Sequence, residues 1–282
     1  MKKVVKIQRA DIYQKVADKV NIYLDTNDYP KSFSYKDSEG IEHNISTSIE
    51  ARSLKGNITR SIVKRNTMTV PYSVTFRGMQ DQLRAELEDL KFSGKQFWDG
   101  ELWVVVRLLA TLNHRAIYET VKGARLGQEY LKEVSKLTDE VASWVTPIYG
   151  LPVMQPSYKM DITRVNTLMG KLSVQYFTDR LDTRSQSNSI APNVIHSLDS
   201  TILFGAVDRG PENIGTIHDC FLVHPNNWRD IQDAFRESYV ELMMAEPLKF
   251  IGHQIDKEQI IEVPNMATLD LNEVLKSKYI IS

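Results

Sequence analysis

Between residues 58 and 72 the sequence places functional side chains at every fourth position, and this spacing constrains the local fold more than any other feature. Residues four apart lie on one face of an α-helix, so the spacing predicts a helix over residues 58–72. Its exposed stripe would carry two cations, a thioether and a phenol: Arg60, Lys64, Met68 and Tyr72. Pro71 lacks a backbone N–H and is expected to kink or end this helix.

The side chains of this stripe suit a nucleoside triphosphate. Arg60 and Lys64 can hold a polyphosphate by charge-assisted hydrogen bonds, while Met68 and Tyr72 can pack against a base or a sugar. Arg65 adds a third cation one step round the helix. An ordinary solvated basic face is the alternative. That alternative does not explain why the thioether and the phenol continue in register with the cations.

Composition limits the class of protein. The 282 residues carry a formal net charge of −1, so a polyanion site must come from local clustering and not from a basic whole. The single cysteine, Cys220, cannot form an intrachain disulfide or a cysteine zinc site, which favours a reducing compartment. Residues 1–9 are basic without an apolar core, and no apolar run approaches membrane-spanning length. We therefore expect a soluble, cytoplasmic protein with no membrane partner.

Periodicity predicts a mostly helical chain with a few extended segments. Helices are predicted at residues 10–25, 58–72, 80–90, 102–112, 116–137, 191–207 and 228–244. Extended structure is predicted as a loop or small hairpin at 27–47, a proline-punctuated loop or β-ribbon at 144–186, and a strand–turn–strand at 215–224. Pro192 fits the first turn of the helix at 191–207.

Asp219 is the candidate metal ligand. It follows His218 in the turn of an apolar hairpin, where a buried carboxylate needs a partner such as a divalent cation. An aspartate in an ordinary β-turn is the alternative. Phosphoryl transfer by two ions roughly 3.5–4 Å apart requires more than one carboxylate. The two candidates for a second acid, Asp199 and Asp161, are not predicted to sit at a strand end.

Three other side chains have both a chemical and a packing interpretation. His196 lies on a predicted helix, where a histidine is usually a packing residue. His218 would more often support a neighbouring metal ligand than react itself. The phenol of Tyr72 could sense a 2′-hydroxyl or be a buried tyrosine.

Several of these segments resemble the single-subunit RNA polymerases of phages and mitochondria. Residues 59–72 (TRSIVKRNTMTVPY) resemble the motif B fingers helix of that family, and residues 217–221 (IHDCF) resemble motif C. Residues 191–199 (APNVIHSLD) resemble the family segment Pro-Asn-Phe-Ile-His-Ser-Leu-Asp. Further matches, in the same order along the chain, are residues 11–13 to the first fingers helix, 144–156 to the start of the specificity loop, and 278–282 to the C-terminal foot.

The resemblance implies an α+β, predominantly helical fold: the fingers and the C-terminal part of the palm of a right-hand polymerase. Fingers would occupy residues 1–195, with an extended specificity-type loop at about 150–186. The palm and the terminal foot would occupy residues 196–282, with Asp219 on a β-hairpin.

The resemblance also implies roles for individual residues. The implied NTP-binding residues are Arg60, Lys64, Arg65, Met68, Tyr72 and His196. The implied catalytic residues are Asp219, Lys64, Tyr72 and His218, with Lys64 as the proton donor to pyrophosphate and Asp219 as a ligand of Mg²⁺. Tyr72 and His196 would judge the ribose 2′-hydroxyl, and Arg164 and Asn166 would contact promoter DNA.

Two departures from the family shape the hypothesis. Motif A, which carries the other metal-binding aspartate, should lie just upstream of the first fingers helix, and this chain begins too late to contain it. Ser73 stands where the family usually has glycine. We therefore expect one subunit of a split phage RNA polymerase that acts in the host bacterial cytoplasm. A partner polypeptide would supply motif A, the thumb and the N-terminal region, and would share two Mg²⁺ ions. DNA template, RNA product and NTPs are the other expected partners.

Two alternatives remain. A fragment of a family A DNA polymerase would share the four-residue ladder, but that family typically has a glutamate where Cys220 stands and a phenylalanine where Met68 stands. A non-catalytic nucleic-acid-binding subunit would have no reason to retain Lys64, Tyr72, His196 and Asp219 together.

Overall fold

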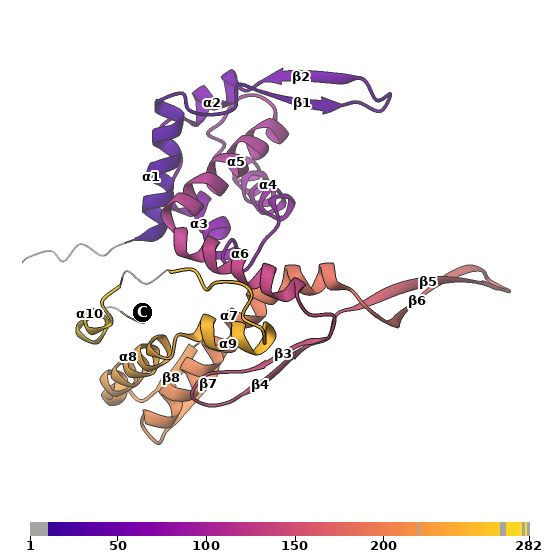
Figure 1. Cartoon of the computed structure of the whole chain (residues 1–282). Helices are drawn as coiled ribbons and strands as arrows, with labels where there is room; N and C mark the ends of the chain where they lie inside the picture. Colours follow the sequence, from indigo (N-terminus) through magenta and orange to yellow (C-terminus); the bar gives the residue numbers. More distant parts are fainter. Residues whose placement is uncertain (1–10, 219, 266–268, 278–279, 281–282) are drawn as a thin grey trace, which may run out of the picture. The chain divides into compact units, whose positions relative to one another are not determined.

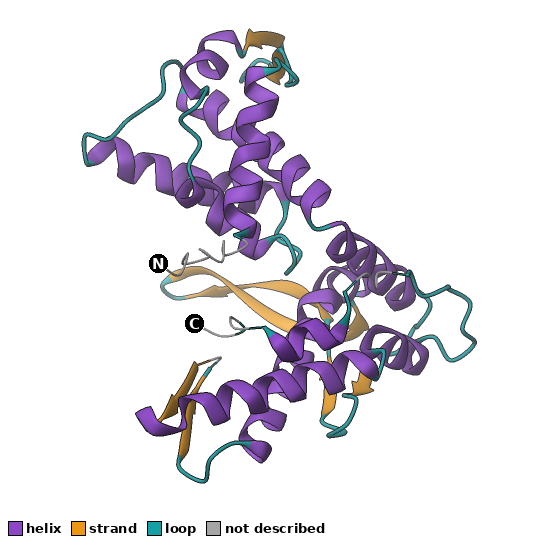
Figure 2. Ribbon diagram, turned by 90° about the vertical axis from the view of Figure 1, so that its left-hand side faces the viewer, coloured by secondary structure: helices purple, strands orange, loops and turns teal. Residues whose placement is uncertain are grey.

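The computed structural model describes every residue except 1–10, 219, 266–268, 278–279 and 281–282. The chain divides into two compact units, Met1–Arg125 and Leu126–Ser282, and each is described by itself (Figure 1). The fold is α+β and mostly helical, as expected. Figure 2 shows the helices in purple and the strands in orange. Across the described ranges the strands form four separate two-stranded antiparallel sheets.

The first unit contains the segment that carries the four-residue stripe. Its elements are α1 (Ile12–Asp25), β1 (Ser32–Lys36), β2 (Glu42–Ser46), α2 (Ser48–Leu54), α3 (Arg60–Thr69), α4 (Phe76–Phe92) and α5 (Leu102–Thr120). Local side chains fix two of the helix starts. Asp11 accepts hydrogen bonds from the backbone N–H groups of Tyr13 and Gln14, and Thr75 accepts one from Gly78.

The core of this unit lies between α1, α3, α4 and α5. α1 contributes Val16, Val20 and Leu24 at helical spacing, as the amphipathic pattern predicts. α5 is buried on most of its circumference because α1 and α4 pack against it. α3 therefore turns one face inward, which leaves the opposite face of this helix in solvent.

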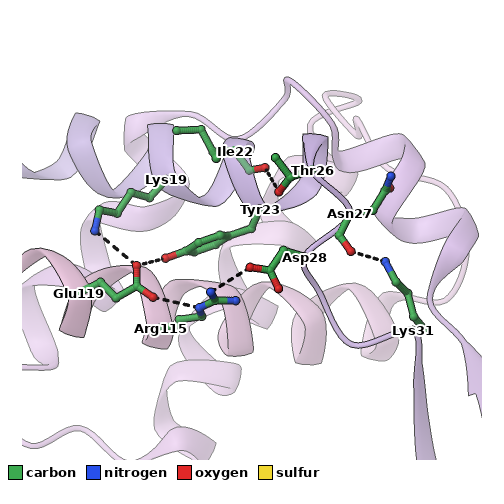
Figure 3. A network of polar contacts seen from close by, with 9 residues as sticks. All are labelled: Lys19, Ile22, Tyr23, Thr26, Asn27, Asp28, Lys31, Arg115 and Glu119. Atoms are coloured by element: carbon green, nitrogen blue, oxygen red, sulfur yellow. Dashed lines mark hydrogen bonds and ion pairs between the residues drawn. The ribbon is translucent and has the colours of Figure 1, made fainter.

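A polar network joins α1 to the end of α5 (Figure 3). Glu119 accepts from the Tyr23 hydroxyl at 2.5 Å and pairs with Arg115 at 3.0 Å and with Lys19 at 3.5 Å. Arg115 also pairs with Asp28 at 2.9 Å and lies over the Tyr23 ring. The hydrogen bond from Tyr23 lowers the pKa of Glu119. The network fixes where α1 crosses α5.

The second unit combines helices with three of the four sheets. Its elements are α6 (Lys122–Lys136, which begins just before the division), β3 (Ala142–Val145), β4 (Pro152–Gln155), β5 (Tyr158–Thr167), β6 (Gly170–Leu181), α7 (Thr183–Arg209), β7 (Ile214–Ile217), β8 (Cys220–Val223), a 3-10 turn η1 (Pro225–Asn227), α8 (Trp228–Met244), α9 (Pro247–Ile255) and α10 (Leu271–Lys276). A second hydrophobic cluster includes Val134, Trp144, Val194 and Ile251. β5 and β6 extend away from the helices of this unit as a long, largely exposed ribbon (Figure 1).

Several predicted boundaries are wrong for identifiable reasons. The helices expected at 102–112 and 116–137 are instead divided at Val121, whose backbone leaves the helical region with φ −118° and ψ 61°. α7 begins at Thr183, so Pro192 lies inside the helix and not in its first turn. α2 was not predicted, because seven residues are too few to show a helical period.

Three predictions concern larger features. The proposed boundary between fingers and palm, after residue 195, falls inside α7 and stays a prediction. Most of the expected terminal foot, residues 278–279 and 281–282, lies outside the described residues. In the ranges that the structure describes, no helix is long and apolar enough to cross a membrane.

Candidate functional site

The helix α3 is shorter than the stripe that predicted it. It ends at Thr69, whose carbonyl oxygen accepts from the N–H groups of Tyr72 at 3.1 Å and Val74 at 3.2 Å. Pro71 has no N–H to continue the helix, and Ser73 takes a left-handed conformation with φ 61°. Tyr72 therefore lies in the turn after the helix, and the expectation of four helical stripe residues is wrong for this one.

Burial of the opposite face exposes the remaining stripe. Ile62, Val63, Asn66 and Thr67 are buried on α3. Arg60, Lys64 and Arg65 are exposed, as is Met68. Met68 is 49% exposed and Tyr72 is 39% exposed, so an apolar and an aromatic surface adjoin the cations. The structure thus brings Arg60, Lys64 and Met68 together on one face of α3, with Arg65 beside them.

The three cations of α3 have different surroundings. Arg60 pairs with Asp11 at 2.6 Å, and its guanidinium lies 4.9 Å from the centre of the Tyr13 ring. The hydrogen bond from Arg60 lowers the pKa of Asp11. Lys64 makes no hydrogen bond or ion pair with any described residue. Among the described residues Lys64 therefore has no partner, whereas the Nε of Arg60 is already engaged by Asp11.

Arg65 acts toward the neighbouring helix α4. Burial raises the pKa of the Glu86 carboxyl, and the charge of Arg65 opposes this change. Arg65 is thus close enough to Glu86 to influence its ionisation while its own side chain remains exposed. An assisting role toward a polyphosphate fits this placement better than a primary one.

A buried polar cluster beneath α3 was not predicted. Asn66 donates to the Gln82 side chain on α4 at 2.9 Å and accepts from Asn113 on α5 at 3.1 Å. Thr69 also donates to Gln82, at 3.1 Å. These bonds fix the last turn of α3, where Met68 and the approach to Tyr72 lie. The sequence gives one sign of these hydrogen bonds, which is the polar residue Asn66 on the inward face of α3.

The strand–turn–strand prediction is confirmed in the second unit. β7 and β8 pair antiparallel with Ile217 opposite Cys220, and His218 follows β7 with φ 55°. A left-handed backbone costs free energy for a residue with a Cβ atom, and such residues are concentrated at functional sites. Asp219, the candidate metal ligand, lies outside the described residues. The hairpin that carries it is therefore described, and its carboxylate is not.

The described residues do not by themselves make a metal site. Among them, no three His, Cys, Asp or Glu side chains could hold a metal ion together. Asp161 pairs with Arg180 at 3.1 Å on the exposed β5–β6 ribbon, so this acid serves a surface ion pair. Asp199 and His196 are exposed on α7, where the neighbouring Ser197 accepts from the Trp144 indole. Asp219, the candidate magnesium ligand, lies outside the described residues, so this absence does not extend to it.

The two residues expected to contact DNA lie on one face of the β5–β6 ribbon. Arg164 is opposite Ser173, and Asn166 is opposite Lys171. Both predicted residues are exposed. The segment predicted as a loop or β-ribbon is thus a ribbon, and residues 164 and 166 share a face because strand side chains alternate.

Comparison with known proteins identifies the family. The sequence profile described as DNA-dependent RNA polymerase matches residues 4–260. DNA-directed RNA polymerase 2, chloroplastic/mitochondrial, of Arabidopsis thaliana is 29% identical over 280 residues, covering 96% of this chain and 26% of that protein. The mitochondrial DNA-directed RNA polymerase of Homo sapiens is 30% identical over 260 residues, covering 82% of this chain and 21% of that protein.

These matches are to RNA polymerases, which favours that hypothesis over a family A DNA polymerase. This chain spans only about a quarter of the length of these two relatives. The match nevertheless covers both units, the exposed cations of α3 and the hairpin of motif C. The chain therefore belongs to the single-subunit, phage and mitochondrial type of DNA-directed RNA polymerase family.

Proposed function

We propose that this chain supplies the triphosphate-binding helix and one metal-binding aspartate for template-directed RNA synthesis. The single observation that carries the proposal is the outward face of α3, which presents Arg60 and Lys64 beside an exposed Met68. A nucleotide has charged phosphates at one end and a base with a flat, largely apolar face at the other. A row of cations followed by an apolar surface is therefore complementary to a nucleotide. Family membership supplies the reaction class: transfer of a nucleotidyl group from an NTP to the RNA 3′ end.

The residues of the first unit would act on the incoming nucleotide. Arg60 and Lys64 would hold its phosphates, and Arg65 would assist. Lys64 would also donate a proton to the leaving pyrophosphate, which suits an ammonium group without a described partner. Met68 would pack on the base, and Tyr72 would test the ribose 2′-hydroxyl.

The residues of the second unit would act on the metal, the sugar and the template. Asp219 would be a ligand of Mg²⁺, with His218 beside it and His196 near the ribose. Bound magnesium would stabilise the charge that develops on the transferring phosphate. Arg164 and Asn166 would contact DNA from the exposed ribbon, where polar side chains of these types can read base edges.

We propose further that a partner polypeptide provides motif A, the thumb and the N-terminal region. The support is that two-metal transfer requires more than one carboxylate, whereas the resemblance to the family assigns a metal ligand in this chain to Asp219. The two Mg²⁺ ions would then be shared between Asp219 and a carboxylate of the partner. A phage source and action in the host bacterial cytoplasm stay predictions.

The decisive experiment reconstitutes RNA synthesis. The purified chain is tested for magnesium-dependent NTP incorporation on a primed template, alone and with the polypeptide that carries motif A. We expect activity only in the mixture. Asp219→Ala should abolish incorporation while the two polypeptides still copurify, and Lys64→Ala should lower the rate by about 10²-fold or more, as loss of a general acid does.

The matched control is Lys91→Ala, which removes an exposed cation from the last turn of α4 in the same unit. This variant should retain wild-type incorporation. Robust synthesis by the chain alone would refute the need for a partner, and an unchanged rate in Asp219→Ala would refute its role as a metal ligand. A non-catalytic subunit would bind template in every variant and show no magnesium-dependent step.

A further inference from the structure

Arg60 is held from two sides by residues at the start of α1. Its Nε donates to Oδ2 of Asp11 at 2.6 Å, and its guanidinium carbon lies 4.9 Å from the centre of the Tyr13 ring. The ion pair occupies Nε, and the ring occupies one face of the group. The two Nη nitrogens make no hydrogen bond to any other residue in the described part of the chain.

Asp11 is itself fixed and cannot follow Arg60 if that side chain moves. Its other carboxylate oxygen, Oδ1, accepts from the backbone N–H groups of Tyr13 at 2.9 Å and Gln14 at 3.2 Å. These bonds make Asp11 the N-cap of α1, and α1 is anchored by Val16 and Val20 in the core. The two carboxylate oxygens therefore have different roles, since Oδ1 caps α1 and Oδ2 holds Arg60.

We propose that Asp11 is a positioning residue that holds Arg60 ready for a polyphosphate, an inference that rests on the proposed triphosphate site of α3. With Nε engaged, the two Nη groups remain as donors for phosphate oxygens. A side chain that is already ordered loses less conformational entropy when the ligand binds, and this strengthens binding. Asp11 does not touch the ligand in this arrangement.

Asp11 could also have the opposite effect on the affinity for a polyphosphate. The negative charge of Asp11 could repel a polyphosphate, in which case removal of that charge would tighten binding. The geometry favours positioning, because the carboxylate is bonded to the guanidinium and to the backbone at once. The direction of the change in affinity therefore decides between the two.

Asp11→Asn separates the two roles of the carboxylate. Asparagine caps a helix about as well as aspartate, so α1 should keep its start, while the amide NH₂ facing Nε cannot accept a hydrogen bond. Binding of inorganic tripolyphosphate to the full chain is measured by titration calorimetry at constant ionic strength. We expect affinity to fall about 3- to 10-fold, the range for losing the order of one long side chain.

A double-mutant cycle shows whether Asp11 acts through Arg60. In an Arg60→Ala background, Asp11→Asn should change the affinity no further, whereas a general effect on α1 would persist. The NMR signal of the Arg60 Nε–H gives an independent readout and should move or broaden in Asp11→Asn without any ligand. Asp182→Asn is the matched control, because Asp182 caps α7 by accepting from Ser185.

The outcomes are distinguishable. Equal or tighter tripolyphosphate binding by Asp11→Asn would overturn the positioning role, even if Arg60→Ala and Lys64→Ala both weaken binding. Unchanged binding in Arg60→Ala and Lys64→Ala would instead overturn the proposed triphosphate site. Absence of binding by the wild-type chain would overturn both.

Discussion

At the residue scale, the ionisation of Tyr23 makes the stability of the first unit depend on pH. Burial raises the pKa of its phenol to about 12, with a further contribution from its hydrogen bond to Glu119. A tyrosine in an unfolded chain titrates near pH 10. Below that pH both states are protonated and the stabilisation is complete, whereas between about pH 10 and 12 the unfolded state ionises first and stability is lost.

We therefore expect the free energy of unfolding to fall between pH 9 and pH 11 by about 1 kcal/mol more in the wild type than in Tyr23→Phe. Urea unfolding at the two pH values measures this difference. Tyr29→Phe is the control, because the hydroxyl of Tyr29 makes only an exposed contact with Asn27 at 3.5 Å. The same pH dependence in wild type and Tyr23→Phe would contradict the raised pKa of Tyr23.

Individual contacts could be predicted from the sequence only where they are local. The spacing of Arg60, Lys64 and Met68 revealed their common face, because helical geometry follows directly from the chain. The pairing of Arg60 with Asp11 spans 49 residues and depends on how α1 packs against α3. Periodicity contains no information on such a contact, so the anchor of Arg60 required the structure.

At the element scale, the turn after α3 holds Ser73 in a left-handed backbone conformation, which serine does not favour. Ser73 has φ 61°, and the polymerase family resembled by this segment usually has glycine there. A left-handed backbone costs a residue with a Cβ atom roughly 1–2 kcal/mol, and the greater chain entropy of unfolded glycine offsets part of the gain from replacing it. Ser73→Gly should therefore raise the free energy of unfolding by up to about 1 kcal/mol.

Chemical denaturation of wild type, Ser73→Gly and Ser73→Ala tests this prediction. Alanine keeps the Cβ atom, so Ser73→Ala should give no gain. Equal stabilisation by both substitutions would show that loss of the hydroxyl matters and that the backbone conformation does not. The comparison also bears on Tyr72, whose position depends on this turn.

The elements themselves were predictable to different degrees. Long periodic helices such as α1 and α8 appeared in the sequence pattern, because one face of each is buried against a core. The break at Val121 did not, since its apolar neighbours continue the helical pattern on both sides. The hairpin β7–β8 was predictable because β-forming apolar residues flank a short polar pair.

At the scale of the whole molecule, the fold class was predictable and the division into units was not. Apolar residues at helical spacing indicate a helical core, whichever helices share it. Which helices do so depends on contacts between distant segments. The structure shows one cluster built around α5 and a second around Trp144 and α7, with no buried residue common to the two in the described part of the chain.

Because the two units have separate hydrophobic cores, a cavity made in one core should destabilise the unit that contains it and leave the other unit unchanged. Leu109 on α5 is fully buried in the first cluster, so Leu109→Ala should destabilise that unit by about 2–5 kcal/mol. Amides of α1 and α5 should then exchange hydrogen faster, while those of α7 keep their protection. Leu131→Ala, in the second cluster, should produce the reverse pattern. Loss of protection in both units from either substitution would mean that they unfold together as one cooperative structure.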